Sequence, residues 1–263
     1  DGWTAYEARL APEIPDSPRR ALDMPRWGGE SLDNKHILVC SEQGTGDQLF
    51  FGAYLPGLVK RAADVTVETD PRLVELLQRS LPTARVRPFS RRVAGLKPTF
   101  TYGWIPRGAD GPDCYIDIAS LPLLSGDTHE RPVAPGGFLV PNPEVVEAWR
   151  RRLTNLSGGR PVVGLFWRSG LITPAREKFY PIIERWAPLL TLDDICFVSL
   201  QFDDDSKDRE TARRLFNASV EKLYDVDLRD DLDQLAALCA ALDGVVAPST
   251  TTANLSWAVV TRT

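Results

Sequence analysis

The sequence predicts an α/β protein made of two halves that face a cleft. From residue 36 onward, short apolar runs typical of buried strands alternate with segments whose apolar residues recur at helical spacing. This alternation implies parallel sheets covered by helices. Near the middle of the chain, residues 126–141 contain three prolines and three glycines, a composition typical of an interdomain crossing.

The first 35 residues show no sustained hydrophobic period and are rich in proline, arginine and tryptophan. We expect residues 1–35 to form an N-terminal arm that is held to the surface by aromatic packing, with Trp3, Tyr6 and Trp27 as the contacts. A binding role for these aromatic residues is the alternative.

The predicted first half covers residues 36–125. Its hydrophobic pattern predicts strands and helices, with the strands at 36–40, 65–68, 84–87 and 114–118 and the helices at 47–58 and 71–81. Asp70 and Pro71 are typical of the start of the second helix. Residues 89–112 show no period, and we expect them to be irregular.

The predicted second half covers residues 142–263. The same pattern predicts strands at 162–167, 195–201, 220–224 and 244–247 and helices at 143–156, 179–190, 206–216 and 231–242. The chain begins without a methionine and ends a few residues beyond an apparent helix. That end comes before the strand and helix that normally finish an α/β unit, so we expect the second half to lack its C-terminal part.

Composition narrows the class of protein. An apolar fraction of 43% with 25% charged residues is typical of a soluble globular chain, and the net charge of −5 argues against general binding to nucleic acid or to a membrane surface. No apolar run has the length of a membrane span, and the N-terminus lacks a basic-then-apolar signal pattern. We therefore expect a cytoplasmic protein with no transmembrane segment.

The four cysteines, at positions 40, 114, 196 and 239, are widely spaced and form no Cys-x-x-Cys pair, and the chain has only two histidines. This pattern favours buried thiols over a metal site or a disulfide framework. We expect no metal.

A glycine-containing loop, residues 41–47, follows the first predicted strand. Gly44 and Gly46 allow positive φ and a close approach of a ligand to the backbone, and Asp47 lies where a helix N-terminus favours a carboxylate. The carboxyl end of a first strand is also where open α/β sheets bind ligands. The loop therefore has two interpretations: a ligand site, or a tight turn in which Asp47 only caps the helix.

The two common phosphate-binding loops do not match this segment. A P-loop needs Lys followed by Ser or Thr after its second glycine, whereas Gly46 is followed by Asp47. A dinucleotide fingerprint needs a third small residue where this chain has Leu49, although Glu68 could mimic its ribose-binding acid. A nicotinamide-dependent oxidoreductase is therefore disfavoured.

Polar groups follow three strands of the second half. Arg168 and Ser169 come after the first, Gln201 closes the second, and the run 249–252 follows the last. Hydroxyls and free amides at a helix N-terminus bind anions, and Arg168 adds a potentially bidentate donor. The combination predicts a diphosphate site. Ordinary helix capping, which needs only one such hydroxyl, is the alternative for residues 249–252.

Several short motifs follow one another along nearly the whole chain. Among them are Glu42-Gln43-Gly44-x-Gly46-Asp47-Gln48, Ser120-Leu121-Pro122, Gly164-Leu165-x-Trp167-Arg168-Ser169-Gly170 and Ser199-Leu200-Gln201. Together they resemble the glycosyltransferase-like domain found behind tetratricopeptide repeats in bacterial proteins. That domain is related to the heptosyltransferases of glycosyltransferase family 9, and more remotely to the O-GlcNAc transferases of family 41.

The resemblance implies a glycosyltransferase-B fold, with a Rossmann-like acceptor half, a Rossmann-like half that holds a nucleotide sugar, and repeats upstream in the full-length chain. It also implies inverting, metal-independent transfer with no cofactor. Asp47 occupies the place of the proposed general base, and a carboxylate there can accept the proton of an attacking hydroxyl. The expected donor-binding residues are Gly44, Gly46, Trp167, Arg168, Ser169, Gln201, Ser249, Thr250, Thr251, Thr252 and Asn254.

The chain departs from the heptosyltransferase pattern at one motif. Where the donor signature reads Asp-Thr-Gly-x-x-His, Ser249 replaces the aspartate and Asn254 the histidine, and a neutral amide cannot carry imidazolium charge. The sequence therefore predicts a glycosyltransferase acting on a protein hydroxyl or a surface glycan. The alternative is a noncatalytic module of the same fold that binds a nucleotide sugar or a partner protein.

Overall fold

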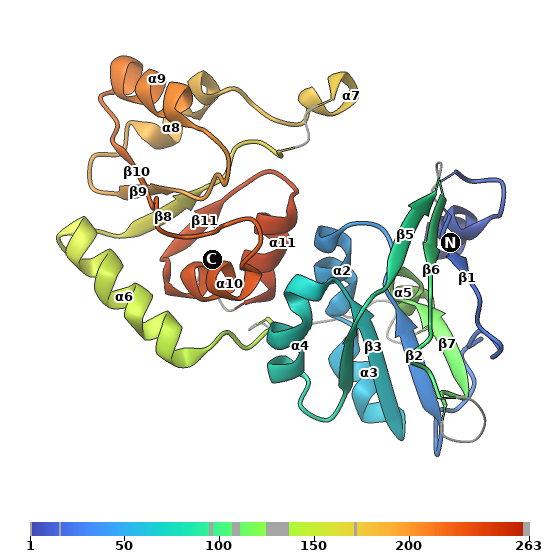
Figure 1. The fold of residues 1–263 in the computed structure, drawn as a ribbon. Helices are drawn as coiled ribbons and strands as arrows, with labels where there is room; N and C mark the ends of the chain where they lie inside the picture. Colours follow the sequence, from blue (N-terminus) through green and yellow to red (C-terminus); the bar gives the residue numbers. More distant parts are fainter. Residues whose placement is uncertain are drawn as a thin grey trace. The chain divides into compact units, whose positions relative to one another are not determined.

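A computed structural model describes residues 2–15, 17–94, 97–106, 111–124, 137–170 and 173–259. The chain divides into two compact units, Asp1–Phe138 and Leu139–Thr263 (Figure 1). Most of the predicted interdomain crossing at 126–141 lies outside the described residues.

The first unit is built on a four-stranded parallel sheet in the order β4-β3-β2-β7. Its strands are β2 (His36–Cys40), β3 (Asp64–Thr69), β4 (Arg85–Pro88) and β7 (Cys114–Asp117). β2 and β3 are almost wholly buried, which is why their sequences read as continuous apolar runs. The four predicted strands are confirmed to within one residue at each end.

The helical segments of this unit are α1 (Gly2–Tyr6), η1 (Glu7–Leu10), α2 (Thr45–Gly52), α3 (Leu55–Arg61), η2 (Pro71–Leu73), α4 (Val74–Ser80), η3 (Ile118–Ser120) and α5 (Leu121–Leu124). The single helix predicted over 47–58 is two helices, α2 and α3. Pro56 explains the break, because it lacks an amide hydrogen and its ring would clash with the carbonyl of Gly52 in a continuous helix.

The prediction that residues 89–112 are irregular was wrong. They contain β5 (Arg91–Ala94) and β6 (Lys97–Phe100), an antiparallel pair, and β6 also pairs in parallel with β1 (Arg19–Arg20) from the arm. Figure 1 shows this second, three-stranded sheet beside the first. The strands are short and polar, and a partner for β6 comes from far away in the sequence, so the local pattern did not reveal them.

The second unit has a parallel sheet in the order β10-β9-β8-β11. Its strands are β8 (Val162–Leu165), β9 (Cys196–Ser199), β10 (Val220–Lys222) and β11 (Gly244–Val246). Its helical segments are α6 (Pro143–Ser157), α7 (Pro174–Glu177), η4 (Ile183–Trp186), α8 (Ala187–Leu190), α9 (Ser206–Phe216), α10 (Leu232–Ala241) and α11 (Thr251–Ala258). The helix predicted at 179–190 begins only at Ile183, after Ile182 in an extended conformation, and it is a 3-10 turn followed by one α-helical turn.

Large apolar side chains form the core of the second unit. On one side of the sheet, Leu165, Trp167, Trp186 and Phe197 lie in one buried cluster. On the other face of β8, Gly164 permits tight packing, since an added Cβ would lie 2.7 Å from a methyl of Leu200 and 2.8 Å from a methyl of Leu242. Burial of this kind stabilises the unit in proportion to the apolar area removed from water.

Candidate functional site

Both parallel sheets have the same order relative to the chain. In each, the first strand lies between the second strand and the fourth. Open parallel sheets bind ligands beyond the carboxyl ends of their strands, at the point where the strand order reverses. We call the ends of β2 and β7 the first switch point, and the ends of β8 and β11 the second switch point.

At the first switch point, the glycine-containing loop leads into α2. Gly44 occupies the N-cap position, and its amide donates a hydrogen bond to Asp47 Oδ2 at 3.0 Å. Asp47 is half-buried in the first turn of the helix. Asp47 therefore does cap the helix, and its additional catalytic role stays a prediction.

Gly44 does not use the positive φ that glycine allows. Gly44 has φ −93°, and the left-handed residue of the loop is Gln43, with φ 57°. Gly44 contributes through its missing side chain, because a Cβ there would lie 3.3 Å from the Asp47 carboxylate. Gly46 lies within α2.

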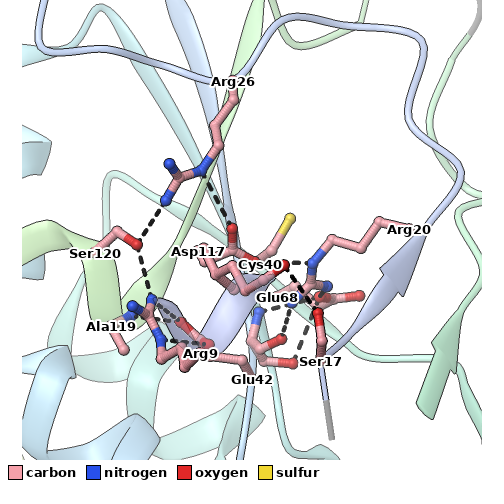
Figure 2. A network of polar contacts seen from close by, with 12 residues as sticks. Arg9, Ser17, Arg20, Arg26, Cys40, Glu42, Glu68, Asp117, Ala119 and Ser120 are labelled. Carbon is pink, nitrogen blue, oxygen red and sulfur yellow. Dashed lines mark hydrogen bonds and ion pairs between the residues drawn. The ribbon is translucent and has the colours of Figure 1, made fainter. Parts of the chain in front are cut away.

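Three buried carboxylates gather at the same edge of the sheet. Glu42, Glu68 and Asp117 are 2%, 0% and 4% exposed, and each follows or ends a strand (Figure 2). Three arginines of the N-terminal arm face them, at positions 9, 20 and 26. Burying a charge is costly unless it is paired, so the arm and the strand ends depend on each other.

Arg20 is the most enclosed of the three arginines, with its side chain 5% exposed. Its Nε donates to Asp117 Oδ1 at 3.0 Å, its Nη1 lies 3.3 Å from Glu68 Oε2, and its Nη2 donates to the Ser41 carbonyl. Nη1 also donates to the Tyr102 hydroxyl. One guanidinium thus joins β2, β3 and β7 to the arm.

Arg9 makes a second ion pair at this edge. Its Nε and Nη2 donate to the two oxygens of Glu42 at 3.0 and 2.7 Å, a bidentate arrangement. Glu42 Oε1 also accepts the Ala119 amide at 3.0 Å, and Arg9 Nη2 donates to the Ser120 hydroxyl at 2.8 Å. Glu42 therefore links the loop after β2 to the segment after β7.

Sequence reasoning missed most of this cluster. The signal available was an acidic residue at the end of an apolar strand, which occurs at Glu68 and again at Asp117. The sequence suggests Glu68 only as a mimic of a ribose-binding acid. The structure pairs it with Arg20 and with the Ser41 amide at 3.1 Å, and its side chain is fully buried.

Burial raises the pKa of Glu68 to about 7, against a partial lowering by Arg20. Folded protein therefore holds this proton between about pH 4.5 and 7, where the unfolded chain has released it. Stability from this group is complete below pH 4.5 and falls as the pH rises to 7. We expect Glu68→Gln to remove that fall, so that the wild type loses about 3 kcal/mol relative to the variant between pH 4.5 and 8.

Urea unfolding at several pH values measures this difference. A matched control is Glu75→Gln, since Glu75 is exposed on α4. Parallel pH profiles for wild type and Glu68→Gln would contradict the prediction.

At the second switch point, Gln201 lies under the loop that follows β8. Its Oε1 accepts the backbone amides of Trp167 and Arg168 at 2.8 and 3.0 Å, and its Nε2 donates to the Arg168 carbonyl at 3.2 Å. Gln201 is fully buried, and its side-chain amide holds the backbone of this loop in place. Trp167 is also buried, and its indole donates to Asp208 at 3.0 Å.

Arg168 is the charged group of this loop. Its Nη2 donates to the Asp204 carbonyl at 2.8 Å and lies 3.4 Å from Asp203, and its Nη1 lies 3.2 Å from Asp208 Oδ2. The Nη1–Asp208 pair is close but not aligned as a hydrogen bond, so Nη1 is buried without a hydrogen-bond partner among the described residues. Arg168 Nη1 therefore has an ion-pair partner but no aligned hydrogen bond among these residues.

The hydroxyl run lies at the start of α11. Thr250 is the N-cap, and its Oγ1 accepts the Ala253 amide at 3.4 Å. Ser249 is exposed, Thr251 is half-buried and Thr252 is buried. Capping is thus confirmed for Thr250. Asn254 lies one turn further along the helix, where its backbone amide donates to the Thr250 carbonyl at 3.0 Å.

All four cysteines are buried and none of them forms a disulfide. Within the described part of the chain, no three or more His, Cys, Asp or Glu side chains are grouped so that they could hold a metal ion. None of the helices described combines the length and apolar character needed to span a bilayer.

We compared the sequence with those of known proteins. No protein-family model matches the chain. It is 32% identical over 265 residues to Protein FlbA of Caulobacter vibrioides, an alignment that covers 99% of this chain and 44% of FlbA. The chain therefore spans less than half the length of that relative.

Among solved structures, the chain is similar to a family 9 glycosyl transferase from Veillonella parvula, with a TM-score of 0.55 and 13% identity over 88% of this chain and 80% of that chain. It is also similar to ADP-heptose LPS heptosyltransferase II of E. coli, with a TM-score of 0.53 and 13% identity over 85% of this chain and 82% of that chain. E. coli heptosyltransferase WaaC with ADP-2-deoxy-2-fluoro heptose gives a TM-score of 0.50 and 13% identity, with 85% of each chain covered.

Likeness at this level of identity concerns the fold alone. It spans both units, each of which has the strand order of a Rossmann-like half. The chain therefore has an α/β fold of the glycosyltransferase-B type.

Proposed function

We propose that the chain is a glycosyltransferase that moves a sugar from a nucleotide-sugar donor to a hydroxyl of a protein or a surface glycan. The observation that carries the proposal is the likeness to family 9 structures across 88% of the chain, combined with a hydroxyl-rich helix start at the second switch point. One neighbour, WaaC, is described with an ADP-linked heptose analogue, so an ADP-linked sugar is the first donor to test.

In this proposal the donor diphosphate binds at the start of α11. In this binding mode, the free amides of the first turn and the hydroxyls of Ser249 and Thr251 would face the diphosphate, and the helix dipole favours negative charge. Arg168 supplies the cationic donor through Nη1. These groups would stabilise the charge that builds on the departing diphosphate, and we expect the transfer to be metal-independent and inverting.

Asp47 is the proposed general base on the acceptor side. Its Oδ2 accepts a hydrogen bond from the Gly44 backbone amide at 3.0 Å. This bond orients the carboxylate and leaves the other oxygen to take a proton from the attacking hydroxyl. Gly44 and Gly46 keep this approach open because neither has a side chain.

A thermal-shift panel of ADP-, UDP-, GDP- and CMP-linked sugars tests the donor site. We expect one nucleotide class to raise the melting temperature of the wild type by several degrees, since a ligand present at 100 times its Kd stabilises by about 2.7 kcal/mol. Arg168→Ala should lose this shift. Arg214→Ala, an equal change of charge at an exposed position of α9, should keep it. No shift with any donor would refute the proposed donor site.

The second candidate is a noncatalytic module of the same fold. Two features favour it: Arg168 lies against Asp203 and Asp208, and Asn254 stands where the related signature has histidine. Binding of one nucleotide class without turnover towards any protein or glycan acceptor would support this candidate.

A further inference from the structure

Two residues of the arm form hydrogen bonds with two consecutive residues of the loop that carries Asp47. Arg9 holds Glu42 through the bidentate pair described above, and the hydroxyl of Tyr6 exchanges hydrogen bonds with the side-chain amide of Gln43 at 2.9 and 3.3 Å. The Arg9 guanidinium lies over the Tyr6 ring, 4.6 Å from its centre. The arm therefore contacts the loop through polar groups at both positions.

The arm also reaches the helix that follows the loop. The rings of Trp3 and Tyr6 lie 6.1 and 6.0 Å from that of Phe51, which is one turn beyond Asp47 on α2. No residue of α1 or η1 is itself buried. Apolar burial therefore explains little of why this segment lies where it does, and the polar contacts to the loop carry more of the attachment.

Gln43 is strained at this point. Among the described residues, the other non-glycine residues with positive φ are Asn34 and Asn217, and asparagine adopts that region readily. Glutamine does not, so its φ of 57° costs free energy that the surroundings must offset. The two hydrogen bonds between the Gln43 side chain and the Tyr6 hydroxyl form in this conformation and offset part of that cost.

The strained residue decides where Asp47 points. The φ of Gln43 orients the peptide that follows it, and that peptide carries the Gly44 amide which donates to Asp47 Oδ2 at 3.0 Å. We propose that Tyr6 is a positioning residue: it holds Gln43 in the left-handed conformation and so aims the Asp47 carboxylate. The role of this carboxylate in catalysis rests on the proposed function, but the positioning itself does not.

Hydrogen exchange on the full chain tests the proposal. The amides of Asp47 and Gln48 both donate to the Gly44 carbonyl at 3.1 Å and report on the loop. We expect Tyr6→Phe to speed exchange at these two amides by about five- to tenfold, the size of one lost hydrogen bond, while the amides of β2 and β3 are unchanged. Trp3→Phe keeps the ring contact without touching the loop and should leave exchange as in the wild type.

A rescue variant separates positioning from general weakening of the arm. Glycine adopts positive φ without strain, so Gln43→Gly in the Tyr6→Phe background should restore slow exchange at Asp47 and Gln48. If Tyr6 merely helped to pack the arm, Gln43→Gly would leave the arm as weakly attached as in Tyr6→Phe and restore nothing. Unchanged exchange in Tyr6→Phe, or no rescue by Gln43→Gly, would overturn the proposal.

Turnover provides the second readout. If the wild type transfers sugar, Tyr6→Phe should lower kcat by about the same factor as the loss of protection and leave the donor KM unchanged, and Gln43→Gly should restore kcat. A wild type without turnover refutes the proposed function, and the exchange data then decide the positioning role by themselves.

Discussion

Replacing Arg20 by methionine is expected to destabilise the first unit by about 3–5 kcal/mol, the largest effect on stability of any substitution considered. Breaking a buried ion pair leaves an uncompensated charge in a medium of low polarity. Arg20 is the partner of both Glu68 and Asp117, and the ion pair left to Asp117 among the described residues would be the one with Arg26, whose Nε lies 3.4 Å away. Since natural domains are stable by about 5–15 kcal/mol, this loss is a large part of the total.

Urea unfolding and thermal melts measure the loss, and a fall of about 10 °C in the melting temperature of the first unit is expected. Arg19→Met is the matched control, because Arg19 is exposed on the same strand β1, and it should change stability by less than about 0.5 kcal/mol. Equal stability of the Arg20 and Arg19 variants would show that the buried pairs contribute nothing.

Asp47→Asn is expected to lower turnover by about 10²–10⁴-fold if the chain is the transferase proposed, the range typical of a lost general base. The substitution is a fine probe of the chemistry, because an amide oxygen can still accept the Gly44 hydrogen bond that caps α2. The helix should therefore remain, and stability should change by less than the cost of a lost cap, about 1 kcal/mol.

Glu75→Gln makes the same chemical change at an exposed position of the first unit and should leave turnover as in the wild type. Donor binding, measured by the thermal shift, should be equal in the wild type and Asp47→Asn. Full turnover in Asp47→Asn would remove Asp47 from the mechanism and require another base.

How far the candidate site follows from sequence differs between its parts. The loop carrying Asp47 and the hydroxyl run 249–252 could be found, because each directly follows an apolar strand and precedes a helix. The contacts of Gln201 could not be found in this way. Its side-chain amide bonds to the backbone of Trp167 and Arg168, 34 and 33 positions away, and its role in donor binding stays a prediction.

The same contrast holds for the arm. Its aromatic residues suggested surface packing, and Trp27 is indeed buried. What ties the arm down more strongly are arginines, which in a sequence look like ordinary surface residues. Nothing local distinguishes Arg20, which is enclosed by carboxylates, from its exposed neighbour Arg19.

By itself, the sequence determined the α/β class, the strand at 36–40, the start of the strand at 162 and the cap at Asp70, because hydrophobic period and capping act between residues a few positions apart. Only the tertiary structure decided the three-stranded sheet that includes β1, the left-handed Gln43, and the pairing of Arg20 with Asp117 across 97 positions of sequence. Those features depend on which strand ends meet at one edge of a sheet, and that is a property of the folded chain that no local pattern encodes.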